Sequence, residues 1–360
     1  LAAISSRLIL RQGKALDVIR AVVAQTGAAA VYWTRLYDPN SIQRDARIKN
    51  ALIEEGVDAR SFGGHLMFEP WTVETKTGGY YKVYTPFWNA VKNRGVGAPV
   101  GGPAALTQPA TWPDSDDIAQ WKMGAAMQRG ARIVRPFVQL GEDAAQARLE
   151  KFIAHGIAEY RRNRDLPGVD GTSNLSENLA LGEISPRQCW HAGQRALNEG
   201  KSGAETFLKE LVWREFAYHL MYHTPRILTE NWREEWKSFP WNQDERRAEV
   251  QAWKQGRTGE RFVDAAMREL YVTGRMHNRG RMIVASYLTK HLMCHWRIGQ
   301  KWFQECLIEE YSEPHSDALA FFQAIPESWN MKPSDPYPDK IIALDDGRTR
   351  ALEIYKSRNF

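Results

Sequence analysis

The sequence predicts a protein of two parts, an N-terminal α/β domain with a parallel sheet and a larger all-α domain. Short apolar runs alternate with amphipathic helical patterns over residues 1–110. Residues 92–120 are rich in Gly, Pro, Thr and Asp, which is typical of a linker. From about residue 141 the pattern is helical to the end of the chain. We therefore expect domains at 1–110 and 141–360, with a linker at 111–140.

The α/β prediction depends on two strands and two helices that alternate. Residues 6–13 and 28–33 are apolar runs with the length of a short buried strand. Residues 15–27 form an amphipathic pattern that ends at Gly27, a residue that favours the left-handed C-cap conformation. Residues 45–57 repeat the helical pattern. Because strands that alternate with helices usually pair in parallel, a parallel sheet is expected.

The composition is that of an ordinary globular protein, with 43% hydrophobic and 25% charged residues in a chain of 360. A net charge of +5 is compatible with a polyanionic partner but does not require one. Cys189, Cys294 and Cys306 are far apart and lack zinc-site spacing, so we expect reduced thiols in a cytoplasmic protein. No apolar run approaches the ~18 residues that span a membrane, and no secretory signal is visible.

Residues 271–297 place polar side chains on a helical pattern that is otherwise apolar. Asn278, Arg281, Met282 and Ala285 follow the i, i+3, i+4, i+7 spacing and therefore share one face. A helix that is apolar nearly all round is buried, so we expect Arg281 to be buried as well. A buried guanidinium needs a carboxylate or phosphate partner. The segment alone fits a structural ion pair as well as an anion-binding site.

Residues 205–222 form a second amphipathic helical pattern. Glu210, Trp213, Arg214 and Ala217 share one face of this helix, while leucine and valine residues occupy the core face. An indole beside charged groups suits stacking on a flat aromatic ligand. A core Trp next to a surface ion pair is the alternative that this triplet leaves open.

These segments and several others resemble the photolyase/cryptochrome flavoprotein family, most closely the bacterial class I cyclobutane pyrimidine dimer (CPD) DNA photolyases. The match runs from about residue 7 to Ile308 and returns weakly near ALAFFQAIPESW and YPDKII. It implies a Rossmann-like α/β antenna-type domain and a helical FAD-binding domain. The matching segments are YTPFWNAV (84–91), GTSNLSENLALGEISPRQC (171–189), ELVWREFAYHL (210–220), AWKQGRTGERFVDAAMREL (252–270), TGRMHNRGRM (273–282) and HWRIGQKWF (295–303).

The sequence departs from the family pattern in two places. The family's α/β domain opens with a strand and a helix that carry a WFRRDLR-like motif, and these opening elements are absent here. After Ile308 the family continues with two aspartates, a GWQW-like run and a stretch near RIFNP, whereas this chain continues with EEYSEPHSD. One of those aspartates pairs with the family's counterpart of Arg281. We therefore expect that the natural chain contains residues omitted here, the alternative being a true deletion.

The resemblance implies FAD as the cofactor. The family segment that holds the flavin pyrophosphate matches residues 172–176, with Asn174 where Arg is common. Asn278 matches a residue over the reactive edge of the flavin that stabilises the reduced anion, and Arg281 supplies positive charge to that anion. Phe207 matches a position near the adenine. The implied cofactor contacts are Tyr160, Thr172, Ser173, Asn174, Leu175, Ser176, Phe207, Glu210, Arg214, Asn278 and Arg281.

The resemblance also implies a flipped-out pyrimidine dimer as the substrate. Glu210 matches the acid that hydrogen-bonds a flipped thymine, and Trp213 matches an indole that stacks on the dimer. Arg275 stands where many relatives have Trp, and a guanidinium can still stack on a pyrimidine. A dimer is poorly stacked and paired, so it leaves the duplex more easily than a normal base. The implied substrate contacts are Glu210, Trp213, Arg275, Arg279, Met282 and Arg164.

Two tryptophans, Trp241 and Trp296, match the outer members of the family's electron relay. The member nearest the flavin falls in the absent stretch. The residues to which the resemblance gives a catalytic role are Asn278, Glu210, Trp241 and Trp296, and no metal is expected.

The function implied is light-dependent DNA repair, in which reduced FAD passes an electron to a CPD. A cryptochrome-type blue-light receptor that binds FAD without repair activity is the alternative, and a flavin-free DNA-binding remnant is a third. The antenna chromophore would be a folate, a deazaflavin or none. The lesion is expected to be a CPD rather than a (6-4) photoproduct. UV-damaged DNA is the expected partner of a monomer that does not bind membranes.

Overall fold

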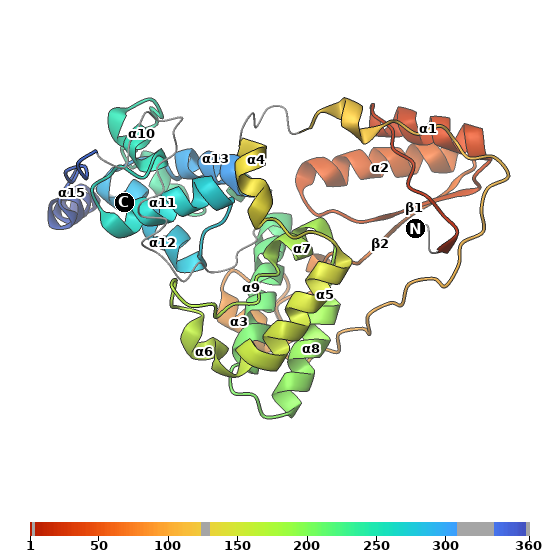
Figure 1. The fold of residues 1–360 in the computed structure, drawn as a ribbon, viewed down its shortest axis with the longest axis horizontal. Helices are drawn as coiled ribbons and strands as arrows, with labels where there is room; N and C mark the ends of the chain where they lie inside the picture. Colours follow the sequence, from red (N-terminus) through yellow and green to blue (C-terminus); the bar gives the residue numbers. More distant parts are fainter. Residues whose placement is uncertain (2–3, 124–129, 308–334, 358–360) are drawn as a thin grey trace. The chain divides into compact units, whose positions relative to one another are not determined.

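The computed structural model describes residues 1, 4–123, 130–307 and 335–357 (Figure 1). The chain packs as two units that interleave in sequence. Unit 1 contains Leu1–Gln128, Ser185–His191 and Glu210–Pro225. Unit 2 contains Arg129–Ile184, Ala192–Lys209 and Arg226–Phe360.

Unit 1 contains a parallel pair of strands, β1 (Ala30–Thr34) and β2 (Asp58–Phe62), with Ala30 opposite Asp58 and Thr34 opposite Phe62. Helix α2 (Pro39–Glu54) connects the two strands, and α1 (Ala15–Thr26) precedes β1 (Figure 1). The apolar face of α2 packs on the sheet through the buried residues Ile48, Leu52 and Ala59. The predicted α/β class and parallel pairing are therefore confirmed.

The boundaries of two elements in unit 1 follow from their caps. Gly27 ends α1 in the left-handed conformation, with φ of 63°, as predicted. Helix α2 begins at Pro39 rather than at residue 45, because the Asp38 side chain accepts a hydrogen bond from Ser41 N and Pro39 fits the first helical position.

The predicted strand at residues 6–13 is wrong. This segment runs beside residues 106–116 and bonds mainly with side chains instead of a strand ladder: Leu10 N donates to Ser115 Oγ and Gln12 N to Asp116 Oδ2. The second strand is β2, whose sequence DARSF is too polar to be recognised as a buried strand.

Helix α3 (Tyr84–Val91) follows the short 3-10 helix η2 (Pro70–Thr72) in unit 1. Residues 95–117 form neither helix nor strand, as a linker predicts, and η3 (Ile118–Trp121) follows them. Two helical elements lie inside the stretch predicted as a linker, α4 (Gly130–Val134) and η5 (Arg135–Phe137). The described elements from residue 142 on are helical, as predicted: α5 (Glu142–Lys151), η6 (Phe152–Gly156), η7 (Ile157–Glu159), α6 (Tyr160–Asn163), α7 (Ser176–Leu181), α8 (Pro186–Asn198), α9 (Ala204–His223), η8 (Pro225–Leu228), η9 (Glu234–Ser238), α10 (Ala248–Lys254), α11 (Arg261–Thr273), α12 (Asn278–Ser286), η10 (Tyr287–His291), α13 (Trp296–Cys306) and α15 (Leu344–Lys356).

The core of unit 2 forms where α10, α11, α12, η10 and α13 meet. Trp253 is its largest fully buried side chain, and its indole N–H donates to Val284 O at 3.0 Å. Met267, Leu270 and Leu288 fill the space around it. A buried indole with a satisfied N–H combines a large hydrophobic contribution with fixed orientation.

The apolar pattern predicted one buried helix over residues 271–297, but the structure breaks this segment after Thr273 and begins a new helix at Asn278. Gly274, with φ of 71°, ends α11, and His277 caps α12 by accepting from Arg279 N. Helix α12 keeps one side in solvent, so Met282 is 55% exposed and Arg281 is half-buried. The expectation that Arg281 is fully buried was therefore wrong.

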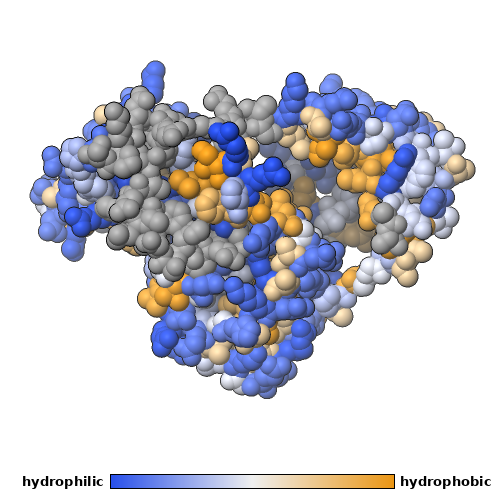
Figure 2. All heavy atoms as spheres, in the orientation of Figure 1, coloured by the Kyte–Doolittle hydropathy of each residue, from blue (hydrophilic) through white to orange (hydrophobic). Residues whose placement is uncertain are grey.

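Within the described ranges, no helix combines the length and the apolarity that crossing a membrane requires. Figure 2 shows that hydrophilic side chains dominate the visible face over α5 and α8. The predicted missing stretch after Ile308 and the weak match near residues 318–329 lie outside the described residues.

Candidate functional site

The predicted site residues fall into both units. Unit 1 holds Glu210, Trp213 and Arg214 on α9. Unit 2 holds the predicted flavin loop, most of the predicted substrate residues and both relay tryptophans.

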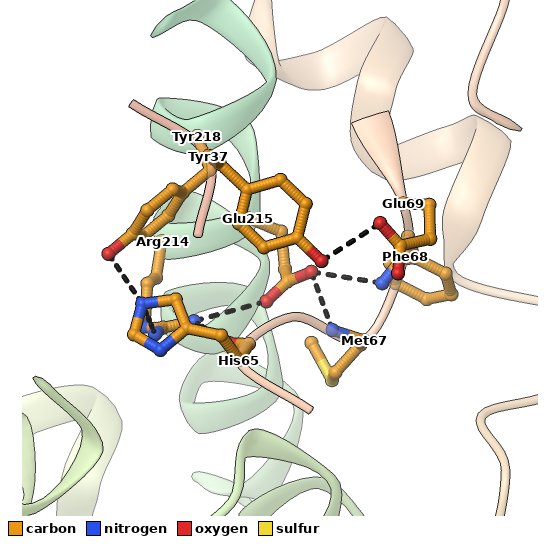
Figure 3. Close-up of polar contacts among 8 residues, drawn as sticks. All are labelled: Tyr37, His65, Met67, Phe68, Glu69, Arg214, Glu215 and Tyr218. Carbon is orange, nitrogen blue, oxygen red and sulfur yellow. Dashed lines mark hydrogen bonds and ion pairs between the residues drawn. The ribbon is translucent and has the colours of Figure 1, made fainter. Parts of the chain in front are cut away.

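Helix α9 carries a buried carboxylate that the sequence reading missed. Glu215 is 2% exposed, and its Oε2 accepts N–H bonds from Met67 at 2.8 Å and from Phe68 at 3.0 Å (Figure 3). Burial raises the pKa of Glu215 to about 7, against the opposing effect of these N–H groups and of Arg214. An acid at a core position of an apolar helix face was the signal that could have revealed it.

Arg214, a predicted cofactor contact, is bound within unit 1 to the same loop. Its guanidinium donates to His65 O at 2.8 Å and lies 3.0 Å from His65 Nε2 (Figure 3). His65 Nε2 also lies 2.7 Å from the Tyr218 hydroxyl. Burial, followed by the charge of Arg214, lowers the pKa of His65 to about 4, so this ring is neutral at pH 7. Arg214 and Glu215 together clamp residues 65–68 to α9.

A second acid anchors the residue pair that follows β1. Glu69 accepts from the Tyr37 hydroxyl at 2.8 Å (Figure 3). It also accepts from Arg35 Nη1 at 2.7 Å. Burial and the bond to Glu69 raise the pKa of Tyr37. Glu69 therefore ties the loop that follows β2 to Arg35 and Tyr37, and Glu215 ties the same loop to α9.

Trp213 lies on the outer side of α9 and is 46% exposed. Its indole stacks on the Tyr84 ring, with the ring centroids 3.6 Å apart and the planes inclined by 5°. Glu210, one turn earlier on the helix, is half-buried. The core side of α9 is apolar as predicted, with Leu208, Leu211 and Val212 buried.

In unit 2, the predicted flavin loop borders a cavity of about 300 Å³. Thr172 Oγ1 donates to Asn174 Oδ1 at 2.7 Å, and Asn174 adopts a left-handed conformation with φ of 51°. Ser176 is the first residue of α7, whose N-cap position is occupied by Leu175, so Ser176 is not an N-cap. The polar residues that line the cavity are Gln139, Arg148, Lys151, His155, Asp170, Thr172, Ser173 and Asn174.

A buried ion pair supports this loop, and the sequence reading missed it. Arg148 Nη1 lies 2.9 Å from Glu177 Oε1 and 2.6 Å from Asn178 Oδ1, and Arg148 Nη2 donates to Gln139 O at 3.0 Å. Glu177 is fully buried. Burial raises the pKa of Glu177 to about 7, although Arg148 opposes this shift. The pair thus joins α5 to the first turn of α7.

Two predicted cofactor contacts, Tyr160 and Phe207, lie together beside this region. Their ring centroids are 6.1 Å apart, and Phe152 contacts both rings at 5.3 and 5.0 Å. Both predicted contacts are buried, which places them in the wall of unit 2 rather than at its surface.

The structure gathers three predicted substrate residues, two of which contact one acid. Arg279 donates to Asp165 Oδ1 through Nε at 2.9 Å and Nη2 at 2.6 Å, and Arg164 Nε lies 3.4 Å from the same oxygen. Arg279 Nη1 also lies 3.3 Å from Met282 Sδ. Two guanidiniums and a thioether therefore form one surface cluster on unit 2.

Asn278 and Arg281 occupy the first turn of α12. Asn278 is exposed, whereas Arg281 Nε donates to Met276 O at 2.9 Å. Glu269 is an acidic neighbour of Arg281: burial raises its pKa to about 7, and the charges of Arg281 and Arg275 oppose the shift. An acidic group therefore acts on Arg281 even without the aspartate of the absent stretch.

Arg275 occupies a different environment from the one predicted. It is 2% exposed, so its guanidinium does not present a face on which a pyrimidine could stack. Burial raises the pKa of both Glu269 and Glu177, and the charge of Arg275 opposes this rise. Arg275 directly follows Gly274, which ends α11, and its backbone N–H donates to Thr273 Oγ1 at 3.1 Å in the interior.

The two predicted relay tryptophans line one cavity of about 980 Å³ in unit 2. Trp241 lies 6.2 Å from the His295 ring, which lies 5.5 Å from Trp296. The Trp296 indole N–H donates to Asn231 Oδ1 at 2.7 Å. The structure therefore brings these two indoles into the same aromatic cluster. Within the described ranges, no group of three or more His, Cys, Asp or Glu side chains could hold a metal ion.

Comparison with known proteins gives a consistent result across sequence and structure. A family model described as DNA photolyase matches residues 1–106, and a model described as FAD binding domain of DNA photolyase matches residues 207–318. The deoxyribodipyrimidine photo-lyase of Agrobacterium fabrum is 41% identical over 314 residues, which cover 87% of this chain and 65% of that protein. The enzyme of the same name from Thermus thermophilus is 36% identical, with 91% of this chain and 78% of that protein covered.

Solved structures agree with these matches. A bacterial class III photolyase from Agrobacterium tumefaciens superposes with a TM-score of 0.87 at 34% identity, covering 99% of this chain and 85% of that one. A cryptochrome from Synechocystis has a TM-score of 0.79 at 22% identity, a likeness that shows the fold alone. The chain spans 65% and 64% of the first two curated relatives, less than two thirds of their length.

Proposed function

Because this chain belongs to the DNA photolyase family, we propose that it is a deoxyribodipyrimidine photo-lyase that binds FAD and repairs UV-damaged DNA in light. The proposed lesion is a cyclobutane pyrimidine dimer. Curated relatives that bear this name over most of the chain support the activity. The predicted class I assignment stays a prediction, since the similar solved structure is described as class III.

The observation that carries the proposal is the cavity beside residues 172–174. It combines hydroxyl groups with the cations Arg148 and Lys151, which is the donor set that a pyrophosphate needs. The buried rings Tyr160 and Phe207 form an apolar wall in the same unit. These residues fit a flavin dinucleotide, whose phosphates would bind the loop. When bound and reduced, FAD supplies the electron that light transfers to the lesion.

The residues of the chain would bind and orient the substrate. Trp213 offers an exposed indole for stacking on an extruded base, and Glu210 on the same helix would accept a hydrogen bond from it. Arg164 and Arg279 carry positive charge toward the DNA backbone. Retention of Glu210, Trp213 and Met282 favours repair over the cryptochrome-type alternative.

The decisive experiment measures flavin content and repair of the purified 360-residue protein. We expect stoichiometric FAD absorption and, after reduction and near-UV illumination, restoration of a dimer-containing oligonucleotide. A yellow protein that leaves dimers intact in light would support the receptor alternative. If the full-length natural chain were colourless as well, both functions would be contradicted and the flavin-free remnant supported.

Substitution of Trp213 by alanine tests the substrate role. We expect the dissociation constant for a dimer-containing oligonucleotide to rise by about 5–150-fold, because stacking of one base contributes ~1–3 kcal/mol. Fluorescence anisotropy in the dark measures it. Trp112→Ala, which removes another partly exposed indole of unit 1, serves as the control and should leave binding unchanged. Equal losses in both variants would argue against the stacking role.

A second chromophore is also proposed, at the carboxyl ends of β1 and β2. There a cavity of about 230 Å³ is lined by aromatic and charged side chains of unit 1, including Trp33, Arg35, Tyr37 and Trp71. Ligands of parallel α/β sheets bind at this edge. A photolyase structure from Sulfolobus tokodaii is described with two FAD molecules. The absorption spectrum of the chromophore extracted from the purified protein distinguishes a folate from a deazaflavin in this cavity.

A further inference from the structure

Tyr84 holds the indole of Trp213 in one orientation. The two rings are stacked in parallel, 3.6 Å between centroids and 5° between planes. Phe216 meets both rings edge-on, at 5.9 Å from Tyr84 and 5.8 Å from Trp213. Such edge-to-face and stacked pairs stabilise by ring electrostatics in addition to buried area. The indole is therefore supported from beneath and from one side.

The support is itself rigid. Tyr84 is the first residue of α3, which is anchored by the fully buried side chains Phe87 and Val91. The Phe87 ring lies 5.2 Å from Phe216, so the anchor of α3 and the support of the indole belong to one aromatic cluster. All of these residues lie in unit 1. A side chain held by a rigid shell presents a surface with little loss of conformational entropy on binding.

The stack leaves one face of the indole for a ligand. Because Tyr84 covers one face, the 46% exposure of Trp213 comes from the opposite face and the ring edges. A planar ring that binds there would extend the tyrosine–tryptophan pair to a stack of three. The outer face thus accepts one flat base and admits it from one direction only.

We propose that Tyr84 is a positioning residue for lesion binding, which acts by holding Trp213 so that only its outer face receives the flipped base. The inference rests on the proposed function, because it explains how the proposed lesion-binding site orients Trp213. Tyr84 itself does not contact the substrate in this scheme. Its removal should free the indole to adopt other rotamers, which lowers the affinity for the lesion without changing the affinity for intact DNA.

A double-mutant cycle tests the proposal on the full chain. Dissociation constants for a dimer-containing oligonucleotide and for its undamaged counterpart are measured in the dark for wild type, Tyr84→Leu, Trp213→Leu and the double variant. We expect Tyr84→Leu to weaken dimer binding by about 3–10-fold, the range of an aromatic pair, with undamaged DNA unaffected. In the Trp213→Leu background the same change should have no further effect, because its action passes through the indole.

Two further variants separate positioning from general stability. Tyr84→Phe keeps the stacked ring and should bind like wild type. Tyr32→Leu removes an exposed tyrosine from β1 of the same unit and should leave dimer binding unchanged. An equal loss from Tyr84→Leu with and without Trp213, or no loss at all, would overturn the inference. If wild type itself does not prefer dimer-containing DNA, the proposed function fails, and this inference fails with it for that separate reason.

Discussion

Replacement of Arg148 by methionine is expected to lower the free energy of unfolding by about 3–5 kcal/mol, the usual loss when one partner of a buried ion pair is removed. Glu177 is fully buried and would lose its cation, which lies 2.9 Å away. Asn178 and Gln139 would lose the same donor. Chemical denaturation of the flavin-free protein measures the change.

The loss at Arg148 should depend on pH in a defined direction. The folded-state pKa of Glu177 is raised to about 7, so the folded protein binds this proton more tightly than the unfolded chain. Stability from this group is present at low pH and is lost as the pH rises through about 7. Without Arg148 the pKa rises further, so the deficit should be larger at about pH 8 than at about pH 5. A pH-independent deficit would contradict this account.

Two variants control the experiment. Arg148→Met combined with Glu177→Met removes both charges and should recover part of the stability, because no buried charge stays unpaired. Lys209→Met removes a cation from an exposed pair with Glu205, 2.9 Å apart, and should cause little change. Since Arg148 also lines the proposed phosphate cavity, Arg148→Met should additionally reduce FAD retention, which absorption measures independently.

Replacement of Glu215 by leucine is expected to lower the free energy of unfolding by about 2–4 kcal/mol. The buried N–H groups of Met67 and Phe68 would both lose their acceptor, at about 1–2 kcal/mol each. Arg214 would lose its acidic neighbour, 3.4 Å away. Thermal or denaturant unfolding, with hydrogen exchange at Met67 and Phe68, measures both the global and the local effect.

Glu215→Gln separates the charge from the hydrogen bonds. An amide oxygen can still accept the N–H groups, so the loss should be smaller than for leucine. Burial raises the folded-state pKa of Glu215 from 4.5 to about 7, and wild-type stability therefore falls relative to Gln as the pH rises across that window. The difference should be as much as about 3 kcal/mol between the ends of the window. An unchanged difference across this range would show that Glu215 titrates normally.

The helical patterns and the motifs were readable from the sequence because both are local. Residues 205–222 carry the spacing of an amphipathic helix, and α9 forms there with the predicted core face buried. Gly27 ended the first helix as predicted, since only a residue without a Cβ adopts that conformation easily. The family resemblance rests on contiguous segments in a fixed order, and the comparisons bear it out.

Prediction of strands and burial from the local sequence failed where a segment packs against a distant part of the chain. Residues 6–13 are apolar enough for a strand, but in the structure they bond with a segment about 100 residues later and form no ladder. The reverse holds for β2, whose polar sequence becomes a strand because β1 and α2 cover it. The expected burial of Arg275 and Arg281 was wrong for the same reason: α11 ends at Gly274 and α12 begins only at Asn278, so Arg275 lies buried between the helices and Arg281 is half-buried on α12.

The sequence by itself determined the fold class, the helical faces and the family, because each follows from residue spacing along a short stretch. The tertiary structure alone decided which charges are paired and which rings are stacked. Glu215 meets Met67 across 148 residues, Arg148 meets Glu177 across 29, and Tyr84 lies flat on Trp213 from a different helix. Long-range contacts of this kind depend on how the elements pack, and burial then sets the pKa of each acid. No local sequence pattern predicts that packing.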